Sequence, residues 1–439
     1  MDLLRRLARS TWMMLAGWIL LGVSCFPSLV AKDQTAVFKL DAWVYYGAVA
    51  QWQAGGSLYD WFGNPVHHTW PFTYTPFAAW VMTPFTVEPD RWFQVQLTVA
   101  TPICVAVTAA VVLRALGGTW RTAWGAAPWI ALAARITLEP IPKTMEYGQV
   151  NAILMAMVAV DLLLVRGRGR GVLCGLAAAV KLTPAIAVLV LVARREWRAA
   201  ATMTGTALGA TALAWLASPT ESARFFLSAM WDPGRAGFAD YSGNQNLKGA
   251  VARSLPEQLW DPVWLVLSLL TVAGTYLLVR RLGRLDGASQ EDGESGLDGE
   301  SREAGDRAPG GTDGLTLLVQ TCAVMTAGLL VSPISWSHHW VWILPTLLGL
   351  AAWALRHDDA AVLGAALLGW AVFALAMQWW FPEQEHVEQD WPVWAAVVGS
   401  SYTWWALGTG AVLWWSSGRV LSRGRAEAGE WDPVGAVAP

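Results

Sequence analysis

Long apolar runs recur along most of the chain, from Trp12 to Ser416, and they constrain the fold more than any other feature. A run of about 20 apolar residues is long enough to cross the hydrocarbon core of a bilayer as one helix. Only 14% of the residues are charged, whereas a soluble domain carries about 25%. The sequence therefore predicts an all-α polytopic membrane protein in which one helical bundle, residues 1–425, is the folding unit.

About ten of these runs are long enough for full spans. Clusters of Lys and Arg orient them, because positively charged loops remain in the cytoplasm. The clusters that begin at Arg5 and Arg419 place both termini there, and the lack of an A-x-A site predicts a retained first helix rather than a signal peptide. The predicted spans lie at roughly 10–30, 92–113, 122–137, 148–165, 199–216, 262–280, 315–332, 340–355, 359–377 and 394–416.

The segment 171–198 departs from this pattern, because a single crossing would leave the basic cluster Arg194, Arg195 and Arg198 outside. The segment is also interrupted by K-L-T-P, and proline disfavours helix at the residue before it. Each half is about ten residues, or roughly 15 Å, which is half a bilayer. We therefore expect a re-entrant helical hairpin with Lys181 near its tip.

The loops complete the predicted topology. External loops are expected at about 31–91, 138–147, 217–261, 333–339 and 378–393. The loop 283–314 is rich in glycine and acidic residues, so we expect a disordered cytoplasmic loop there and a similar tail at 426–439. The four cysteines are isolated, which predicts neither a metal site nor a disulfide framework. A net charge of −3 gives no indication of a nucleic-acid partner.

Asp41 begins the first external loop, at the membrane boundary. Apolar positions recur at helical spacing from Trp43 to Trp52, and Gly55 and Gly56 follow, which predicts an external amphipathic helix that ends there. Asp41 can cap the N-terminus of this helix. A carboxylate at this depth can also be a general base for a sugar hydroxyl of a lipid-linked substrate. One residue can serve in both ways.

Lys181 is the residue most costly to bury, because a lysine within the membrane must be paired or hydrated. It can pair with Asp161, or it can line a cavity and attract an anion such as a lipid phosphate. Gln149 and Asn151 stand at the membrane boundary, where amides either tie helices together or bind a substrate hydroxyl.

Two further external motifs are rich in polar side chains. In S-P-I-S-W-S-H-H-W, His338 and His339 either anchor the loop at the interface or donate to a phosphate or hydroxyl near Asp41. The adjacent His67 and His68 lack a third metal ligand nearby, and P-F-T-Y-T-P is expected to form a rigid turn. A basic patch suited to a headgroup or a sugar comprises Asn244, Gln245, Lys248 and Arg253.

The chain contains 30 tryptophans. Interfacial belts account for many of them. Some of the external ones can instead stack on sugar rings.

Six motifs together resemble glycosyltransferase family 87, which includes mycobacterial polyprenyl-phosphate-mannose-dependent α-1,2-mannosyltransferases. They occur in the family's order over about 41–345, and the K-L-T-P and S-P-I-S-W-S-H-H stretches are the most specific. N-Q-N at 244–246 departs from the more usual N-Q-S. The motifs are D-A-W-V-Y-Y with G-G-S-L-Y-D, F-T-Y-T-P-F, Y-G-Q-V-N, G-L-A-A-A-V-K-L-T-P, N-Q-N-L-K-G and S-P-I-S-W-S-H-H-W-V-W-I-L-P.

The resemblance implies a GT-C fold, an extracytoplasmic active site, and a donor of the polyprenyl-phosphate-sugar type. It implies an inverting, metal-independent reaction without a cofactor, in which the family's early aspartate corresponds to Asp41 as general base. The aromatic motif residues Tyr45 and Tyr74 join the expected binding site. The acceptor, a cell-envelope glycolipid or glycan, and the oligomeric state do not follow from it.

A competing class is a transporter or flippase of lipid-linked saccharides. Such a protein needs polar residues through many spans and pseudo-repeated halves. Here the polar residues gather at the external ends of the spans, which favours an enzyme.

Overall fold

The computed structural model describes residues 11–30, residues 39–294 apart from 65, 67, 68 and 88, and residues 314–427 apart from 384 and 385. The regular structure of these residues is almost entirely helical, in agreement with the predicted class. A small antiparallel hairpin, β1 (Phe62–Asn64) and β2 (Thr69–Pro71), lies in the loop predicted to be the first external one and was not predicted. His67 and His68, between these strands, lie outside the described residues.

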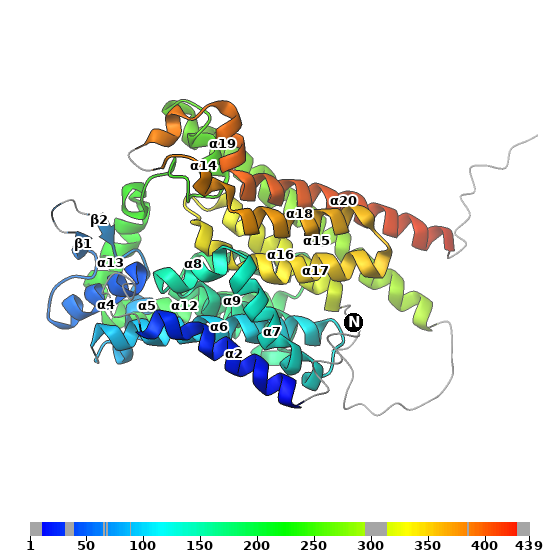
Figure 1. Cartoon of the computed structure of the whole chain (residues 1–439), viewed down its shortest axis with the longest axis horizontal. Helices are drawn as coiled ribbons and strands as arrows, with labels where there is room; N and C mark the ends of the chain where they lie inside the picture. The colour runs from blue at the N-terminus through cyan, green and yellow to red at the C-terminus, as the bar shows by residue number, and fades with distance from the viewer. Residues whose placement is uncertain are drawn as a thin grey trace, which may run out of the picture.

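The long helices form a bundle, and each predicted span except 394–416 coincides with one of them. In Figure 1 the helices of the first half, coloured blue to green, lie below those of the second half, coloured yellow-green to red. The first set is α2 (Thr11–Val30), α6 (Asp90–Ala115), α7 (Trp120–Thr137), α9 (Asn151–Leu163) and α12 (Trp197–Ala217). The second set is α15 (Trp260–Glu294), α16 (Gly314–Val331), α17 (Ile343–His357), α18 (Ala360–Leu375) and α20 (Ser401–Glu427).

The apolar character of these helices suits a membrane environment. Among the described residues, four helical stretches are long and apolar enough to cross a bilayer: Asp90–Ala115, Glu257–Leu285, Gly314–Val331 and Ala360–Trp380. The stretch in α15 exposes large side chains, including Leu265, Leu269 and Leu270, because few of its residues are buried by the other helices. Lipid rather than water is the solvent that matches such a surface.

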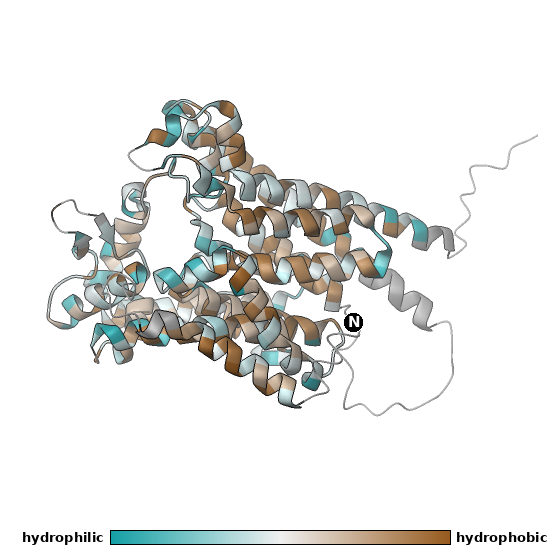
Figure 2. Cartoon of the chain, viewed as in Figure 1, coloured by the Kyte–Doolittle hydropathy of each residue, from teal (hydrophilic) through white to brown (hydrophobic). Residues whose placement is uncertain are grey.

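One end of the bundle carries most of the short elements. In Figure 1 they lie at the left and upper left, and the C-terminal ends of α15 and α20 point the opposite way. Figure 2 shows much of the hydrophilic colour at this crowded end. Five of these elements come from segments predicted to be external: α4 (Leu40–Gln53), α5 (Pro76–Met82), α8 (Pro140–Tyr147), α13 (Pro219–Leu227) and α14 (Leu247–Ala252). The sixth, α19 (Val393–Gly399), comes from the start of the span predicted at 394–416.

The segment 171–198 is interrupted where K-L-T-P predicted. α10 (Val172–Val180) ends at Lys181, whose backbone is extended, and η3 (Thr183–Ala187) and α11 (Val188–Ala193) follow. Close packing against α12 is possible because residue 175 is glycine: a Cβ there would lie 2.5 Å from the Met203 carbonyl oxygen.

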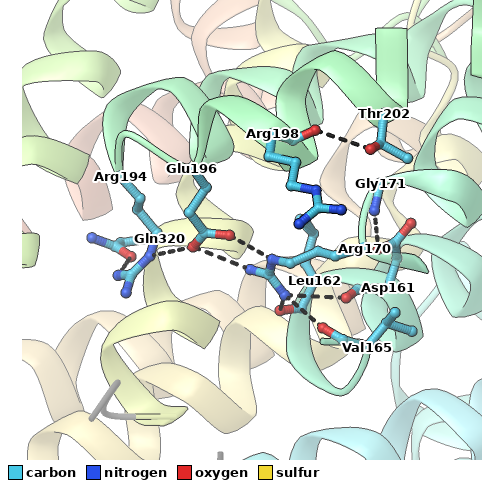
Figure 3. A network of polar contacts seen from close by, with 10 residues as sticks. All are labelled: Asp161, Leu162, Val165, Arg170, Gly171, Arg194, Glu196, Arg198, Thr202 and Gln320. Carbon is cyan, nitrogen blue, oxygen red and sulfur yellow. Dashed lines mark hydrogen bonds and ion pairs between the residues drawn. The ribbon is translucent and has the colours of Figure 1, made fainter. Parts of the chain in front are cut away.

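The two ends of this segment are held together by an ionic network (Figure 3). Glu196 accepts from Arg170 at 2.5 Å and from Arg194 at 3.1 Å. Asp161 accepts from the backbone N–H groups of Gly171, at 2.7 Å, and Cys174, at 2.8 Å. The predicted alternative that Asp161 pairs with Lys181 is wrong, because this carboxylate caps the N-terminus of α10 at the other end of the helix.

Three further expectations need correction. α15 continues to Glu294, so the loop predicted at 283–314 begins as helix, and 295–313 and 428–439 lie outside the described residues. The span predicted at 394–416 is divided at Ser400 into α19 and α20. Asp41 is not the N-cap of α4, because Lys39 occupies that position and Asp41 lies in the first helical turn.

Candidate active site

Asp41 is positioned by α4. This helix buries one face, including Ala42, Tyr45 and Val49, and it ends where Gly55 adopts a left-handed conformation, as the sequence predicted. Its first turn lies directly against Gly148, the left-handed C-cap of α8. A Cβ on Gly148 would lie 2.7 Å from the Ala42 Cβ, so only glycine allows this approach. The contact brings the start of α4 next to Gln149.

Tyr45, Tyr74 and Gln149 form a buried triangle of hydrogen-bonding groups. The Tyr45 hydroxyl lies 2.8 Å from the Tyr74 hydroxyl and 2.8 Å from Gln149 Oε1, and the Tyr74 hydroxyl lies 2.9 Å from the same oxygen. Because the amide oxygen faces the phenols, the Gln149 amide N–H is free to contact the Asp41 side chain, with which it interacts. The aromatic residues of the predicted motifs thus orient Gln149 toward Asp41.

His338 faces Asp41. It lies in η7 (Ser337–Trp342), and its Nε2 is 3.9 Å from Asp41 Oδ2. The His338 carbonyl accepts from Thr144 Oγ1 at 2.8 Å and from Asn151 Nδ2 at 3.1 Å, which fixes the backbone at this residue. Its ring packs against the Tyr147 ring at a centroid distance of 4.6 Å. Nε2 itself is buried and has no hydrogen-bond partner among the described residues.

His339 faces Lys181. The Lys181 ammonium lies 3.5 Å from His339 Nε2, donates to Asn151 Oδ1 at 2.9 Å, and sits 5.1 Å from the centre of the Tyr74 ring. No ion pair joins the ammonium to a carboxylate in the described part of the chain. Thr75 also joins the first loop to α10, because its hydroxyl donates to the carbonyl oxygen of Ala179 at 2.5 Å. The tip of 171–198 therefore meets the first external loop.

The electrostatics of this cluster suit proton transfer. Burial raises the pKa of Asp41 to about 6, while the Gln149 hydrogen bond and the positive charge of Lys181 act in the opposite direction. Burial and the nearby Lys181 charge hold the pKa of His338 and of His339 well below the usual value, so both rings are neutral. A carboxylate with a pKa near neutrality can accept and release a proton at the working pH.

Glu139, which was not predicted, supports the histidine loop. Its carboxylate accepts from Ser337 Oγ at 2.8 Å, Trp379 Nε1 at 2.9 Å and the Tyr402 hydroxyl at 3.1 Å. Burial raises the pKa of Glu139, against the effect of these three donors. Glu139 directly precedes the proline that starts α8. This position in the sequence gives no indication that the Glu139 side chain has three distant partners.

The predicted basic patch is separate from this cluster. Asn244 accepts from the Ser335 N–H at 2.9 Å, and the main chain of Gln245 donates to the Ser335 carbonyl at 2.9 Å. The Arg253 guanidinium donates to the carbonyl oxygens of Asp240, Tyr241 and Asn244 and to Ser400 Oγ.

These side chains hold the backbone that precedes the histidines. Lys248 forms a 2.7 Å ion pair with Asp261 at the start of α15. At the N-Q-N position, Asn246 caps α14 by accepting from the Gly249 N–H at 2.7 Å, a bond that a serine side chain can also make. The structure gives all of these residues protein partners.

Comparisons with known proteins agree with the motifs. The profile of glycosyltransferase family 87 matches residues 72–290. The polyprenol-phosphate-mannose-dependent alpha-(1-2)-phosphatidylinositol mannoside mannosyltransferase of Mycobacterium tuberculosis is 32% identical, with 90% of this chain and 88% of that protein aligned. The protein of the same name from Mycolicibacterium smegmatis is also 32% identical, over 83% of this chain and 81% of that protein.

A third relative extends the comparison to a different acceptor. The M. smegmatis polyprenol-phosphate-mannose-dependent alpha-(1-2)-phosphatidylinositol pentamannoside mannosyltransferase is 32% identical, over 77% of this chain and 74% of that protein. No solved structure matches the chain. The apolar bundle, its polar cluster and these relatives define a membrane glycosyltransferase. The chain belongs to glycosyltransferase family 87, as the six motifs predicted.

Proposed function

We propose that this enzyme transfers mannose from a polyprenyl-phosphate-mannose donor to a hydroxyl group of a mannosylated glycolipid on the extracytoplasmic side of the membrane. The names of the relatives support the donor and the class of acceptor. One observation carries the proposal. Asp41, Gln149, Lys181 and His338 come from four distant segments and converge on one cluster.

Asp41 is the general base in this proposal. Its carboxylate takes the proton of the acceptor hydroxyl as the oxygen attacks the anomeric carbon of the donor. The carbon–oxygen bond to the phosphate breaks on the opposite face, so the configuration inverts and the electron pair leaves with the phosphate. His338, neutral and with an unpartnered Nε2 beside Asp41, orients either the carboxylate or the incoming hydroxyl.

Lys181 stabilises the leaving phosphate. Its partly buried ammonium is bonded to an amide oxygen and lies within electrostatic range of Asp41, and a phosphate within reach adds a directly bonded negative charge. His339, 3.5 Å from the ammonium, is a second group placed to contact the phosphate. Charge stabilisation of this kind requires fixed donors close to the oxygen that becomes charged.

The lipid part of the donor lies beside the same segment. An apolar groove of about 540 Å³ runs between Leu189 of α11, Tyr276 of α15 and Val331 at the end of α16. We assign the isoprenoid tail to this groove and treat α10, η3 and α11 as a re-entrant hairpin with its tip toward the extracytoplasmic side. The ionic network at Glu196, which joins the two ends of the segment, supports a chain that enters and leaves on one side.

The test is Asp41→Asn, which keeps the shape of the side chain and removes its ability to accept the proton. We expect mannose transfer from a labelled polyprenyl-phosphate-mannose donor to be lost in purified protein that remains folded. Asp60→Asn is the matched control, since Asp60 is in the same external loop, with a side chain 65% exposed. Full activity of Asp41→Asn would remove Asp41 from the mechanism, and transfer by the wild type in detergent, without a gradient, excludes pure transport.

A further inference from the structure

A row of aromatic side chains extends from the active-site cluster, and we call Tyr147, Trp379, Tyr241 and Trp336 the aromatic strip. The centre of the Tyr241 ring lies 5.7 Å from that of Trp336 and 6.2 Å from that of Trp379. The Lys143 ammonium links Trp379 to Tyr147, because it lies 5.8 Å from the centre of the Trp379 ring and 5.9 Å from the centre of the Tyr147 ring. All four rings are half-buried.

The strip begins at the reacting groups. The Tyr147 ring packs on His338 at 4.6 Å, and His338 is the histidine that faces Asp41. The other three rings come from η8 (Met377–Trp380), from the loop before α14 and from the loop before η7. Four segments distant in the sequence therefore build one surface that leads away from the cluster.

Polar groups accompany the rings along their length. The Trp379 indole donates to Glu139 at 2.9 Å, and Glu383 accepts from Ser242 Oγ at 3.0 Å while its side chain remains exposed. Lys143 is paired with Glu146 and is only 31% exposed. Flat apolar faces with carboxylates and an amine at their edges complement a pyranose, which presents C–H groups on one face and hydroxyls around its rim.

A belt of tryptophans at the membrane interface is the competing explanation. Trp380, the neighbour of Trp379, is an example of a belt residue. Trp380, 57% exposed, bonds only to the Leu375 carbonyl through its indole N–H. The strip differs, because its rings are half-buried, face one another or Lys143, and lie next to carboxylates.

We propose that the aromatic strip binds the saccharide chain of the acceptor, beyond the sugar that receives the new mannose. This inference rests on the proposed function, because it assigns the acceptor an oligosaccharide rather than a single sugar. The Tyr241 ring is separated from the Trp336 and Trp379 rings by roughly the length of one pyranose unit. The strip therefore contacts at least two sugars in addition to the one at Asp41.

Binding can be measured without transfer. Purified Asp41→Asn protein in detergent is titrated calorimetrically with soluble mannose, mannotriose and mannotetraose. We expect the tetrasaccharide to bind at least tenfold more tightly than the monosaccharide. Tyr241→Leu in this background removes one ring while keeping bulk, and it should weaken tetrasaccharide binding roughly five- to tenfold, the loss expected for one aromatic contact.

Two controls isolate the ring. Tyr241→Phe keeps the aromatic face and should retain most of the affinity, and Trp380→Leu removes an exposed indole outside the strip and should leave the affinity unchanged. Equal binding of mannose and mannotetraose, or no loss in Tyr241→Leu, would overturn the proposal. So would a Tyr241→Leu defect confined to association with phospholipid vesicles, the behaviour of a belt residue.

The transfer reaction separates this proposal from the proposed function. Wild-type enzyme that mannosylates short and long acceptors with the same KM retains its function and refutes the strip. Wild-type enzyme that binds mannotetraose through Tyr241 but transfers no mannose to any acceptor supports the strip and refutes the assigned reaction.

Discussion

Gly148→Ala tests whether the close approach of α4 to α8 sets the catalytic geometry. Residue 148 has φ of +68°, where an L-residue costs about 1–2 kcal/mol. The added Cβ would lie 2.7 Å from the Ala42 Cβ, and ordinary contact begins at 3.4 Å, so the start of α4 must move by at least 0.7 Å, the difference between these distances. Asp41 is adjacent to Ala42 and moves with it. Displacement of a reacting group by about 1 Å can slow a reaction 10²-fold, so we expect kcat to fall by roughly ten- to a hundredfold.

Gly55→Ala is the matched control. Gly55 has φ of +92°, so alanine is strained there as well, but an added Cβ meets no atom within 4 Å. Both variants should lose thermal stability in detergent through the positive φ, Gly148→Ala more because of its overlap with Ala42, whereas only Gly148→Ala should lose transfer activity. Initial rates at saturating donor and acceptor make the comparison. Wild-type kcat in Gly148→Ala, or an equal loss in Gly55→Ala, would show that the contact does not control the position of Asp41.

Three further outcomes follow from the charges. The pKa of Asp41 is raised to about 6 and the proposed mechanism needs its ionised form, so kcat/KM should rise with pH through about 6; a limb near pH 4, the range of an ordinary aspartate, would contradict this. Lys181→Met should raise the donor KM roughly ten- to a hundredfold, as loss of one charged hydrogen bond predicts, with partial rescue in Lys181→Arg and no fall in Tm; a change only in the acceptor KM would refute the phosphate role. Glu196→Gln should lower stability by about 1–3 kcal/mol because Arg170 loses its carboxylate, as measured by thermal unfolding in detergent, and an unchanged Tm would show that the network does not hold the two ends of segment 171–198 together.

Much of the bundle could be predicted because its signals are local. Apolar runs and basic clusters located every long helix, and K-L-T-P located the break at Lys181. Thr75 caps the N-terminus of α5 and Pro76 is its first residue, and α4 ends before Gly55. Local sequence predicts both boundaries. Local rules also produced errors. The loop was predicted to begin at residue 283, but α15 continues through this glycine-rich, acidic segment to Glu294, because an established helix can extend into residues with low helical propensity.

Partners distant in the sequence could not be predicted. Nothing near Glu139 indicates that it bonds to Ser337, Trp379 and Tyr402. The amide and guanidinium groups of 244–253 suggested a substrate site because such groups bind sugars and phosphates well. They bind backbone carbonyls equally well, and only the tertiary packing decides which partner is present.

Three local costs coincide at the candidate site. The Lys181 ammonium is partly buried next to an amide and a neutral histidine, His338 Nε2 is buried with no hydrogen-bond partner in the described part of the chain, and burial disfavours the charge on Asp41. Each costs stability alone, and a folded protein normally pairs or removes such groups. Natural proteins retain unfavourable local features chiefly where function requires them. An anionic phosphate beside Lys181 and a hydroxyl between His338 and Asp41 would satisfy all three groups at once, and these are the leaving group and the attacking group of the proposed transfer.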